Sequence, residues 1–225
     1  MIEVVTSRNA LLYREALEDM YRLRHRALAA RLGPERLDRR GGVLKDRFDT
    51  DAAIHLLLTE DDGTVQGALR LLPTTAPHVL SEVLPQTCEF KGLQRDAKTL
   101  ELSRFCIDPK LDRAAAEVGR NRLLVGLFEF CRRAGYERLT ALIATDVLYH
   151  HLLIGLDIKP LGLSTERDGR KQVAVVVRMS DEALAAMRLA LNVHASQVHY
   201  VGAPVEDALT LVPMPQGPWP LEAAE

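Results

Sequence analysis

Five consecutive residues near the end of a predicted first helix supply the first candidate chemical group, Arg22-Leu23-Arg24-His25-Arg26. Successive helical residues point about 100° apart, so only one or two of these cations can face a common site. Arg24 lies one turn from both Met20 and Leu28, close to the apolar side of the helix. The spacing makes Arg24 the one expected to turn inward, although solvated surface is the simpler reading for any one of these arginines taken alone.

Two carboxylates three residues apart form the second cluster, Asp46-Arg47-Phe48-Asp49. Residues at this spacing can lie on the same side of one turn, where they could hold a cationic ligand such as an ammonium or a sulfonium. A solvated acidic loop is the competing interpretation, because the cluster sits in a long polar connection over residues 33–51. Connections of this length are uncommon unless they bind something or move.

Charged residues on two predicted strands form the third and fourth clusters. Arg70 comes at the end of an apolar strand and is followed by Leu71-Leu72-Pro73-Thr74-Thr75, which suggests a sheet rim, where α/β sheets bind ligands. In Glu101-Leu102-Ser103-Arg104-Phe105, strand alternation places Glu101, Ser103 and Phe105 on one face and the other two on the opposite face. A buried glutamate and arginine must be paired or serve a ligand, and a structural ion pair is the simpler reading.

The elements that must position these clusters follow from hydrophobic periodicity. Strands are predicted over residues 2–6, 54–59, 64–72, 100–107, 139–143 and 172–179. Helices are predicted from an N-cap at Ser7 to residue 32, then over residues 114–133, 147–154 and, capped by Ser180, 181–191. This order predicts a single α/β domain over residues 1–200, a mixed sheet flanked by helices, followed by an irregular Pro-rich tail over residues 201–225.

Composition excludes several classes of protein. The net charge is −2, with both signs mixed along the chain, so nucleic acid is not an expected partner. The three cysteines lack the spacing of a disulfide framework or a zinc site, and no metal is expected because the adjacent His150 and His151 diverge on a helix. No signal peptide or membrane-spanning run is visible, so the expected location is the cytoplasm.

Taken in order, the four clusters resemble those of the acyl-homoserine-lactone synthases, the autoinducer synthase family. The resemblance runs from the N-terminus to about residue 190. It rests on Tyr21-Arg22-Leu23-Arg24 followed by Arg31-Leu32-Gly33, on Asp46-Arg47-Phe48-Asp49, on Leu69-Arg70-Leu71-Leu72-Pro73-Thr74-Thr75 and on Glu101-Leu102-Ser103-Arg104-Phe105. The last motif is the most specific of the four.

The resemblance implies a three-layer fold like that of the N-acetyltransferases, with a V-shaped split in its sheet. It implies an enzyme that transfers an acyl group from a thioester, acyl-acyl carrier protein or acyl-CoA, to the amine of S-adenosylmethionine and then closes the lactone with release of methylthioadenosine. No tightly bound cofactor is implied. The implied catalytic residues are Glu101, as general base, with Arg70 and Arg104, and the implied S-adenosylmethionine pocket includes Arg24, Leu28, Asp46, Asp49, Ser103 and Phe105.

Two positions depart from the family pattern: Leu28 stands where an aromatic residue is usual and Pro34 where a tryptophan is usual. In the family, both residues normally line the nucleotide and acyl pocket.

The identity of the acyl donor is less clearly indicated by the sequence. The stretch from Pro73 to Val83 resembles a branch that includes acyl-CoA users, whereas the stretch from Ser180 to Arg188 resembles makers of long-chain signals.

Other residues of the chain bear on the donor. Arg113, Arg120 and Arg122 stand by the start of a helix and could meet a phosphate of the carrier, or simply be solvated. Ala141 replaces a threonine typical of relatives that handle 3-oxo chains, which predicts a weak preference for such chains.

Two other functions stay open on the sequence. An ordinary N-acetyltransferase would share the fold, but it would want a glycine-rich pyrophosphate loop before the long helix, where only Gly119 is found. A non-catalytic S-adenosylmethionine-binding relative would explain the departures at Leu28 and Pro34, but the complete charged set argues for an enzyme.

Overall fold

The computed structural model describes residues 1–33 and 42–199. Its strands are β1 (Ile2–Val5), β2 (Ile54–Thr59), β3 (Val65–Pro73), β4 (Thr99–Ile107), β5 (Arg138–Ala144), β6 (Ile158–Pro160), β7 (Thr165–Arg167), β8 (Arg170–Arg178) and β9 (Val198–His199). Its helices are α1 (Arg14–Leu32), α2 (Val79–Glu82), α3 (Arg113–Arg133), α4 (Thr145–Leu153) and α5 (Asp181–Ala190), with 3₁₀ turns η1 (Ala10–Tyr13) and η3 (Pro85–Cys88).

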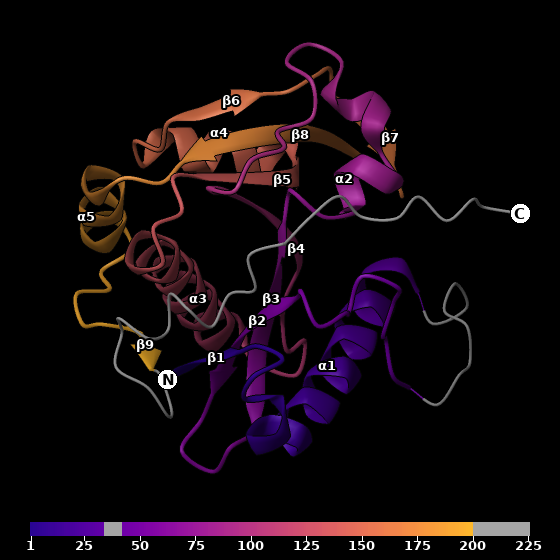
Figure 1. Ribbon diagram of the computed structural model, residues 1–225. Coiled ribbons are helices and arrows are strands. Elements are labelled where there is room, and N and C mark those ends of the chain that lie inside the picture. Colours follow the sequence, from indigo (N-terminus) through magenta and orange to yellow (C-terminus); the bar gives the residue numbers. More distant parts are fainter. Residues whose placement is uncertain (34–41, 200–225) are drawn as a thin grey trace, which may run out of the picture.

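All these strands belong to one mixed sheet with the order β6-β8-β5-β4-β3-β2-β1-β9, and β7 pairs with β8 (Figure 1). The parallel pairs are β4 with β5 and β1 with β9, and the other neighbours are antiparallel. β4 and β5 pair only from Thr99 to Leu102, although β4 continues to Ile107. The sheet therefore splits beyond Leu102, as the resemblance implies.

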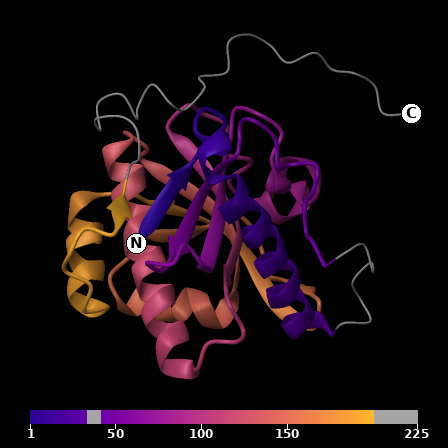
Figure 2. The ribbon, with the colours of Figure 1, turned by 90° about the horizontal axis from the view of Figure 1, so that it is seen from below.

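Helices cover both faces of the sheet and make three layers (Figure 2). The largest apolar core lies between the sheet and α3, with Leu148 of α4 and Leu184 of α5 packed against it. A smaller core on the other face holds Met20 and Leu23 of α1. This arrangement explains why β2 is buried along its whole length: its residues meet packed side chains on both faces of the sheet.

The N-terminal boundary of the first helix differs from the expectation. α1 begins at Arg14, after the 3₁₀ turn η1, and its N-cap residue is Tyr13 rather than Ser7. The side chain of Asn9 instead ties the chain before η1 to the end of β1, because its Oδ1 accepts from the backbone N–H of Thr6 and its Nδ2 donates to the carbonyl of Val4. Local hydrogen bonds of this kind compete with helix initiation.

Alternation along β4 is broken by a β-bulge, which overturns the predicted faces. Arg104 has a positive φ of 56°, and the β3–β4 register shifts between Ala68 and Arg70. An extra residue in one strand reverses the faces beyond it. Phe105 therefore packs in the α3 core beside Leu102, whereas Arg104 joins Ser103 on the α1 face.

Short elements that periodicity did not predict complete the structure. α2 and η3 lie in the connection over residues 73–98, while β6, β7 and β9 extend the sheet at its edges. None exceeds four residues, which is too short for a periodic pattern to be recognised. The tail expected over residues 201–225 lies outside the described residues.

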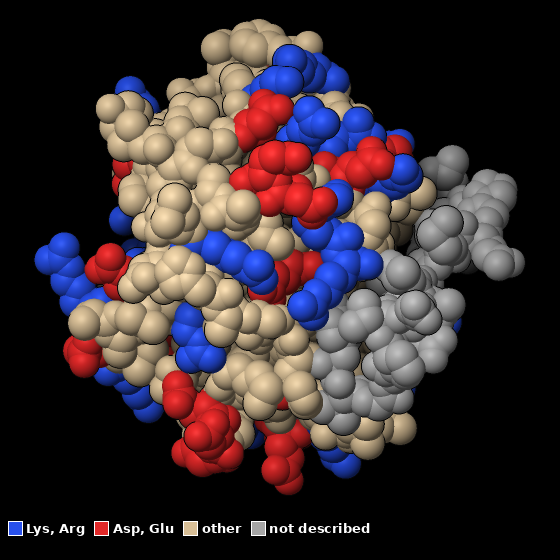
Figure 3. Space-filling model, turned by 90° about the vertical axis from the view of Figure 1, so that its left-hand side faces the viewer, with Lys and Arg blue, Asp and Glu red and all other residues tan. Residues whose placement is uncertain are grey.

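Surface charge is mixed in sign. On the face that carries α5, basic and acidic side chains alternate without a large patch of one sign (Figure 3). Within residues 1–33 and 42–199, no helix is both long enough and apolar enough to cross a bilayer.

Candidate active site

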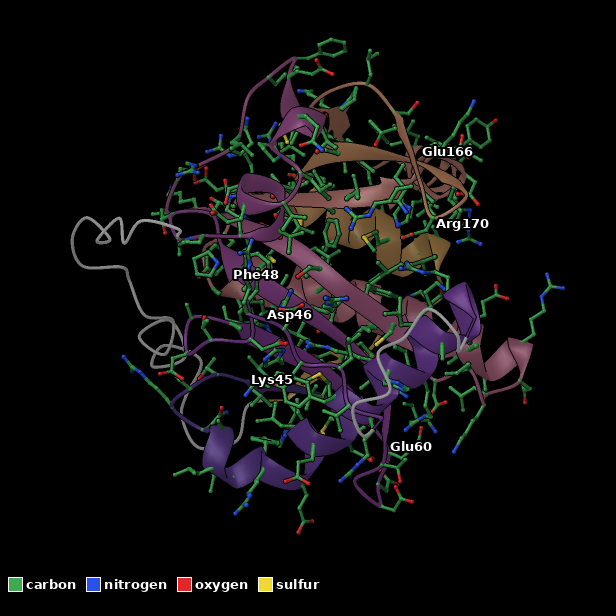
Figure 4. The ribbon with its side chains drawn as sticks, turned by 90° about the vertical axis from the view of Figure 1, so that its right-hand side faces the viewer. Lys45, Asp46, Phe48, Glu60, Glu166 and Arg170 are labelled. Carbon is green, nitrogen blue, oxygen red and sulfur yellow. The ribbon has the colours of Figure 1, made fainter. Side chains whose placement is uncertain are left out.

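Three arginines from different elements converge on two aspartates on the α1 face of the sheet. Arg24 comes from α1, Arg70 from β3 and Arg104 from the bulge of β4. Asp46 and Asp49 come from a tight turn after the undescribed residues, in which the carboxylate of Asp46 accepts from the backbone N–H of Phe48. Figure 4 shows Asp46 and Phe48 side by side on this face, far from Glu166 and Arg170 of the β7–β8 hairpin.

The ion pairs in this arginine–aspartate cluster are short and specific. Nη1 of Arg70 donates to Oδ1 of Asp46 at 2.6 Å and lies 2.9 Å from Oδ1 of Asp49. Arg24 Nη1 donates to the same Asp49 oxygen at 2.7 Å. Arg104 holds the other oxygen of Asp46 through Nε at 2.9 Å and through Nη2.

Several charged side chains of this cluster are buried, so each of these charges needs an oppositely charged partner. Arg70 and Asp49 have no exposed side-chain surface, and Arg24 has 1%. The guanidiniums of Arg70 and Arg104 hold the pKa of Asp46 well below its ordinary value, despite the burial that opposes ionisation. Arg24 and Arg70 lower the pKa of Asp49 in the same way, so both carboxylates are charged at neutral pH.

The arginines outnumber the aspartates by one, so the cluster carries a net positive charge. The direct hold on a cationic ligand suggested by the Asp46–Asp49 spacing would require breaking one of these ion pairs. Nε of Arg24 and Nη2 of Arg70 are buried and have no hydrogen-bond partner among the described residues, which leaves donors able to meet a ligand carboxylate or carbonyl. The cluster is therefore better suited to an anionic part of a ligand.

His55 on β2 adds a neutral contact to Arg24. Guanidinium groups only donate, so Nη2 of Arg24 donates to Nδ1 of His55 at 3.1 Å. Burial, and then the positive charge of Arg24, lowers the pKa of His55 to about 3. The ring of Tyr21 covers the other side, with the Arg24 guanidinium 5.3 Å from its centroid. Arg24 is thus fixed in one position by three groups.

Glu101 forms a second buried group on the same face, and its partner is a histidine rather than Arg104. Its Oε2 lies 2.6 Å from Nδ1 of His78 and accepts from the backbone N–H of Leu80 at 2.7 Å, while Oε1 accepts from that of Val79 at 2.9 Å. Both Glu101 and His78 are 1% exposed. The carboxylate caps the first turn of α2 and orients the imidazole.

The structure brings most of the predicted site residues together. Ser103 accepts from Nε of Arg70 at 3.1 Å, and Arg24 turns inward as predicted. Arg70 is not at a rim: it lies within β3 and is fully buried. Phe105 packs in the α3 core, away from the cluster, because of the bulge.

The remaining predicted positions are spread over the molecule. Leu28 is half-buried on α1, and Ala141 is buried in the main core opposite Leu102. Arg122 donates to Gln197, and Arg113 and Arg120 are exposed on α3. Pro34 lies outside the described residues.

Sequence reasoning missed His55, His78 and the ring of Phe48. Phe48 is 9% exposed and packs with Ala53, Leu72 and Val79, and the guanidinium of Arg70 lies 5.7 Å from its ring centroid. The sequence could have indicated Phe48, because an aromatic residue between two aspartates can contribute an apolar wall to a charged site. His55 and His78 gave no such signal, because single histidines in apolar or Pro-rich stretches have no distinguishing pattern.

A surface cavity of about 330 Å³ lies elsewhere, between the loop after η3 and the ends of β5, β6 and β8. Its charged walls include Glu137, Arg138, Asp157 and Lys159. These residues are engaged in surface ion pairs with Lys98, with Asp96 and with one another. The candidate chemical centre is the arginine–aspartate cluster rather than this solvated cavity. Burying charged side chains has a large desolvation cost, whereas the ion pairs around the cavity are exposed.

Comparison with known proteins identifies the family of this chain. Residues 8–187 match the sequence profile of the family described as autoinducer synthase. The isovaleryl-homoserine lactone synthase of Bradyrhizobium diazoefficiens is 31% identical over 163 residues, covering 72% of this chain and 73% of that protein.

Solved structures show the same fold. The CoA-dependent acyl-homoserine lactone synthase BjaI, solved with SAM and isopentyl-CoA, superposes with a TM-score of 0.83 at 27% identity, over 94% of this chain and 98% of that one. A putative N-acetyltransferase from Lactobacillus plantarum superposes with a TM-score of 0.52 at 16% identity, over 80% and 99% of the two chains. The second likeness concerns the fold alone and confirms the N-acetyltransferase-like architecture.

Proposed function

This chain belongs to the autoinducer synthase family, and from that premise we propose which substrates it takes and how its buried charges carry the reaction. It is an acyltransferase of the acyl-homoserine-lactone synthase class. The acyl acceptor is the α-amine of S-adenosylmethionine, and the products are an acyl-homoserine lactone and methylthioadenosine. The observation that carries this proposal is the pairing of Arg24, Arg70 and Arg104 with two aspartates beside Glu101, in which Arg24, Arg70 and Asp49 are buried.

The cluster is suited to hold the acceptor through its carboxylate. The unpartnered Nη2 of Arg70 is a buried donor in a net positive surrounding, which favours an anionic group. Asp46 and Asp49 fix the three guanidiniums, and Phe48 offers an aromatic face near Arg70. We assign the pocket to Arg24, Asp46, Asp49 and Ser103, with Leu28 at its edge.

Glu101 belongs to the part of the site that assists removal of a proton from the acceptor amine. An α-amine is mostly protonated near neutral pH and cannot attack a thioester until it loses a proton. The thioester carbonyl gains negative charge in the transition state and needs donors. Backbone N–H groups of β4 beyond Leu102, where β5 no longer pairs with it, are candidates for that role.

Lactone closure needs little from the protein besides positioning. The carboxylate of the acylated intermediate attacks its own γ-carbon, the C–S bond to the sulfonium breaks, and methylthioadenosine leaves. Because the step is intramolecular, a folded conformation of the bound intermediate supplies most of the acceleration. Arg70 and Arg104 would set that conformation.

We propose acyl-CoA as the donor, because the CoA-dependent synthase BjaI superposes over nearly the whole chain. Acyl-acyl carrier protein is the alternative donor. We also propose that residues 1–200 form the synthase domain, and that it works in the cytoplasm. The three free cysteines are consistent with a reducing compartment.

The test is a reaction of the purified chain with S-adenosylmethionine and either hexanoyl-CoA, isovaleryl-CoA or hexanoyl-acyl carrier protein, followed by mass spectrometry. We expect acyl-homoserine lactone and methylthioadenosine to form in equal amounts. The CoA donors should be turned over faster than the carrier-protein donor. Faster turnover of the carrier-protein donor would overturn the donor assignment. Acetyl transfer to a simple amine without any lactone would instead identify an N-acetyltransferase.

A further inference from the structure

The hydrogen bonds of Glu101 leave it poorly placed to take a proton from a substrate. Its two oxygens form hydrogen bonds with His78 Nδ1 and with the backbone N–H groups of Val79 and Leu80, all within 2.9 Å. Both oxygens of Glu101 are thus engaged by groups of the protein itself. Three donors of the protein therefore already occupy the positions from which this carboxylate could meet a substrate ammonium.

His78 has the complementary property. An ionised carboxylate only accepts, so Nδ1 of His78 carries the hydrogen in the bond to Glu101. In the neutral ring Nε2 then holds a free lone pair, and this atom is buried without a hydrogen-bond partner among the described residues. A carboxylate that fixes the tautomer of a histidine in this way makes the distal nitrogen a directed base.

The position of His78 places it beside the arginine–aspartate cluster. Glu101 pairs in register with Leu72, and the neighbouring pair on the same face is Ser103 with Arg70. Val79, next to His78 in the chain, packs with Phe48 and Leu72, and Phe48 lies under the guanidinium of Arg70. The unpartnered acceptor of His78 and the unpartnered donor of Arg70 thus belong to adjoining parts of one sheet face.

We propose that Nε2 of His78 accepts the proton of the substrate ammonium and that Glu101 is a positioning residue that acts through His78. This inference rests on the proposed function. The ammonium proton passes to Nε2, and Nδ1–H stays on Glu101. The amine nitrogen then attacks the thioester carbonyl, the new C–N bond forms, and the C–S bond breaks. The departing thiolate takes the second amine proton, and the imidazolium returns its proton to solvent.

Imidazole suits this step because a ring nitrogen with a free lone pair can accept a proton and release it again in each cycle. The proposal also distinguishes the two chemical steps. Acylation needs a base, whereas lactone closure of the acylated intermediate needs none, because a carboxylate is already the nucleophile. Loss of His78 Nε2 should therefore affect only the first step.

The test uses His78→Asn in the full chain. The Asn side-chain nitrogen occupies the place of Nδ1, so the bond to Glu101 is kept while the Nε2 lone pair is removed. Acylation is measured in single turnovers with S-adenosylmethionine and the CoA thioester that the wild-type enzyme uses. Lactone closure is measured separately from synthetic N-acyl-S-adenosylmethionine. His194→Asn, at an exposed residue after α5, is the matched control.

We expect His78→Asn to slow acylation by about 100-fold to about 10,000-fold, which is the usual contribution of a general base. Lactone closure and the affinity for S-adenosylmethionine should stay within about threefold of wild type. Glu101→Gln should also lower the rate of acylation and leave the rate of lactone closure unchanged. If His78→Asn acylates at the wild-type rate, or if both steps fall together, His78 is not the base.

The two steps are measured on one protein sample, so a loss of folded enzyme lowers both and cannot imitate the expected result. Should His78→Asn not fold, His78→Gln is measured in the same way. A wild-type enzyme that forms no lactone contradicts the proposed function itself. A wild-type enzyme that is active beside an equally active His78→Asn contradicts only the role of His78.

Discussion

Arg70 is the residue on which the buried charges depend, since it has no exposed surface and contacts both Asp46 and Asp49. Replacing it by Met leaves two carboxylates short of a partner in a buried setting. Breaking such a pair typically costs about 3–5 kcal/mol. We expect Arg70→Met to lower the free energy of unfolding by about that amount, measured by urea denaturation.

The matched change is Arg22→Met, at an exposed arginine of α1 whose partners are the exposed Glu18 and Asp19. Its effect should stay within about 0.5 kcal/mol, because surface ion pairs contribute little. Equal effects of the two substitutions would show that the Arg70 pairs carry no special share of the stability.

His55 gives a pH dependence of known sign. Its pKa in the folded chain is lowered to about 3 from an ordinary value of 6.5, so between these values the unfolded chain binds the proton and the folded chain does not. The free energy of unfolding therefore has its full value with respect to this group above pH 6.5. It decreases as the pH falls below 6.5, by about 1.4 kcal/mol for each pH unit.

His55→Asn keeps an acceptor oxygen for Arg24 but does not titrate. We expect its free energy of unfolding to be flatter than that of wild type between pH 6.5 and 4.5, a range above the ordinary aspartate pKa of 3.8. His194→Asn, at an exposed site, should retain the wild-type slope. Parallel curves for His55→Asn and wild type would mean that His55 is not held neutral.

At the scale of elements, the two serines that the sequence offered as N-caps have different roles in the structure. Ser180 Oγ accepts from the backbone N–H of Ala183 at the start of α5, whereas Ser7 is exposed and lies before η1. We expect Ser180→Ala to lower the free energy of unfolding by about 1 kcal/mol and Ser7→Ala to change it by less than about 0.5 kcal/mol. A reversed order in thermal denaturation would restore Ser7 as the cap.

The bulge in β4 is the point beyond which strand alternation no longer predicted the face of each residue. The strand itself was predicted to within one residue, and Glu101, Leu102 and Ser103 lie on the faces that alternation gave them. Beyond Ser103 the faces are reversed by one residue in left-handed conformation. That conformation is uncommon for arginine, and here it is held by the bond of Arg104 to Asp46, 58 residues away in the chain.

At the scale of the whole molecule, Glu129 joins the end of the described chain to the core. This residue of α3 is 1% exposed and accepts from Arg188 of α5, from Ser196 Oγ and from the backbone N–H groups of Gln197 and Val198. It thereby fixes β9 beside β1 at the sheet edge.

Glu129→Ala should destabilise the chain by about 3 kcal/mol, because Arg188 loses its partner in a half-buried setting. Hydrogen exchange at Gln197 and Val198 should accelerate more than exchange in β3 and β4, since these two amides lose their acceptor. Glu117→Ala, at an exposed position of the same helix, is the control and should change neither. Unchanged protection of β9 would show that its pairing with β1 suffices.

The sequence by itself determined the long elements, the fold class and the identity of the charged residues, because apolar periodicity and helix or strand length are local properties. It also determined that Arg24 faces inward, since its spacing from Met20 and Leu28 is fixed within one helix. These features do not depend on which distant segment each element meets.

Only the tertiary structure decided which charges are partners. Residues from α1, β2, β3, β4 and the turn at Asp46 meet through contacts between segments 24 to 58 residues apart in the chain. The pairing of Glu101 with His78 and the reversal at Arg104 arise in the same way. Burial is the physical reason: a charge removed from water must find a partner in space, and the chain order does not state which partner the fold brings to it.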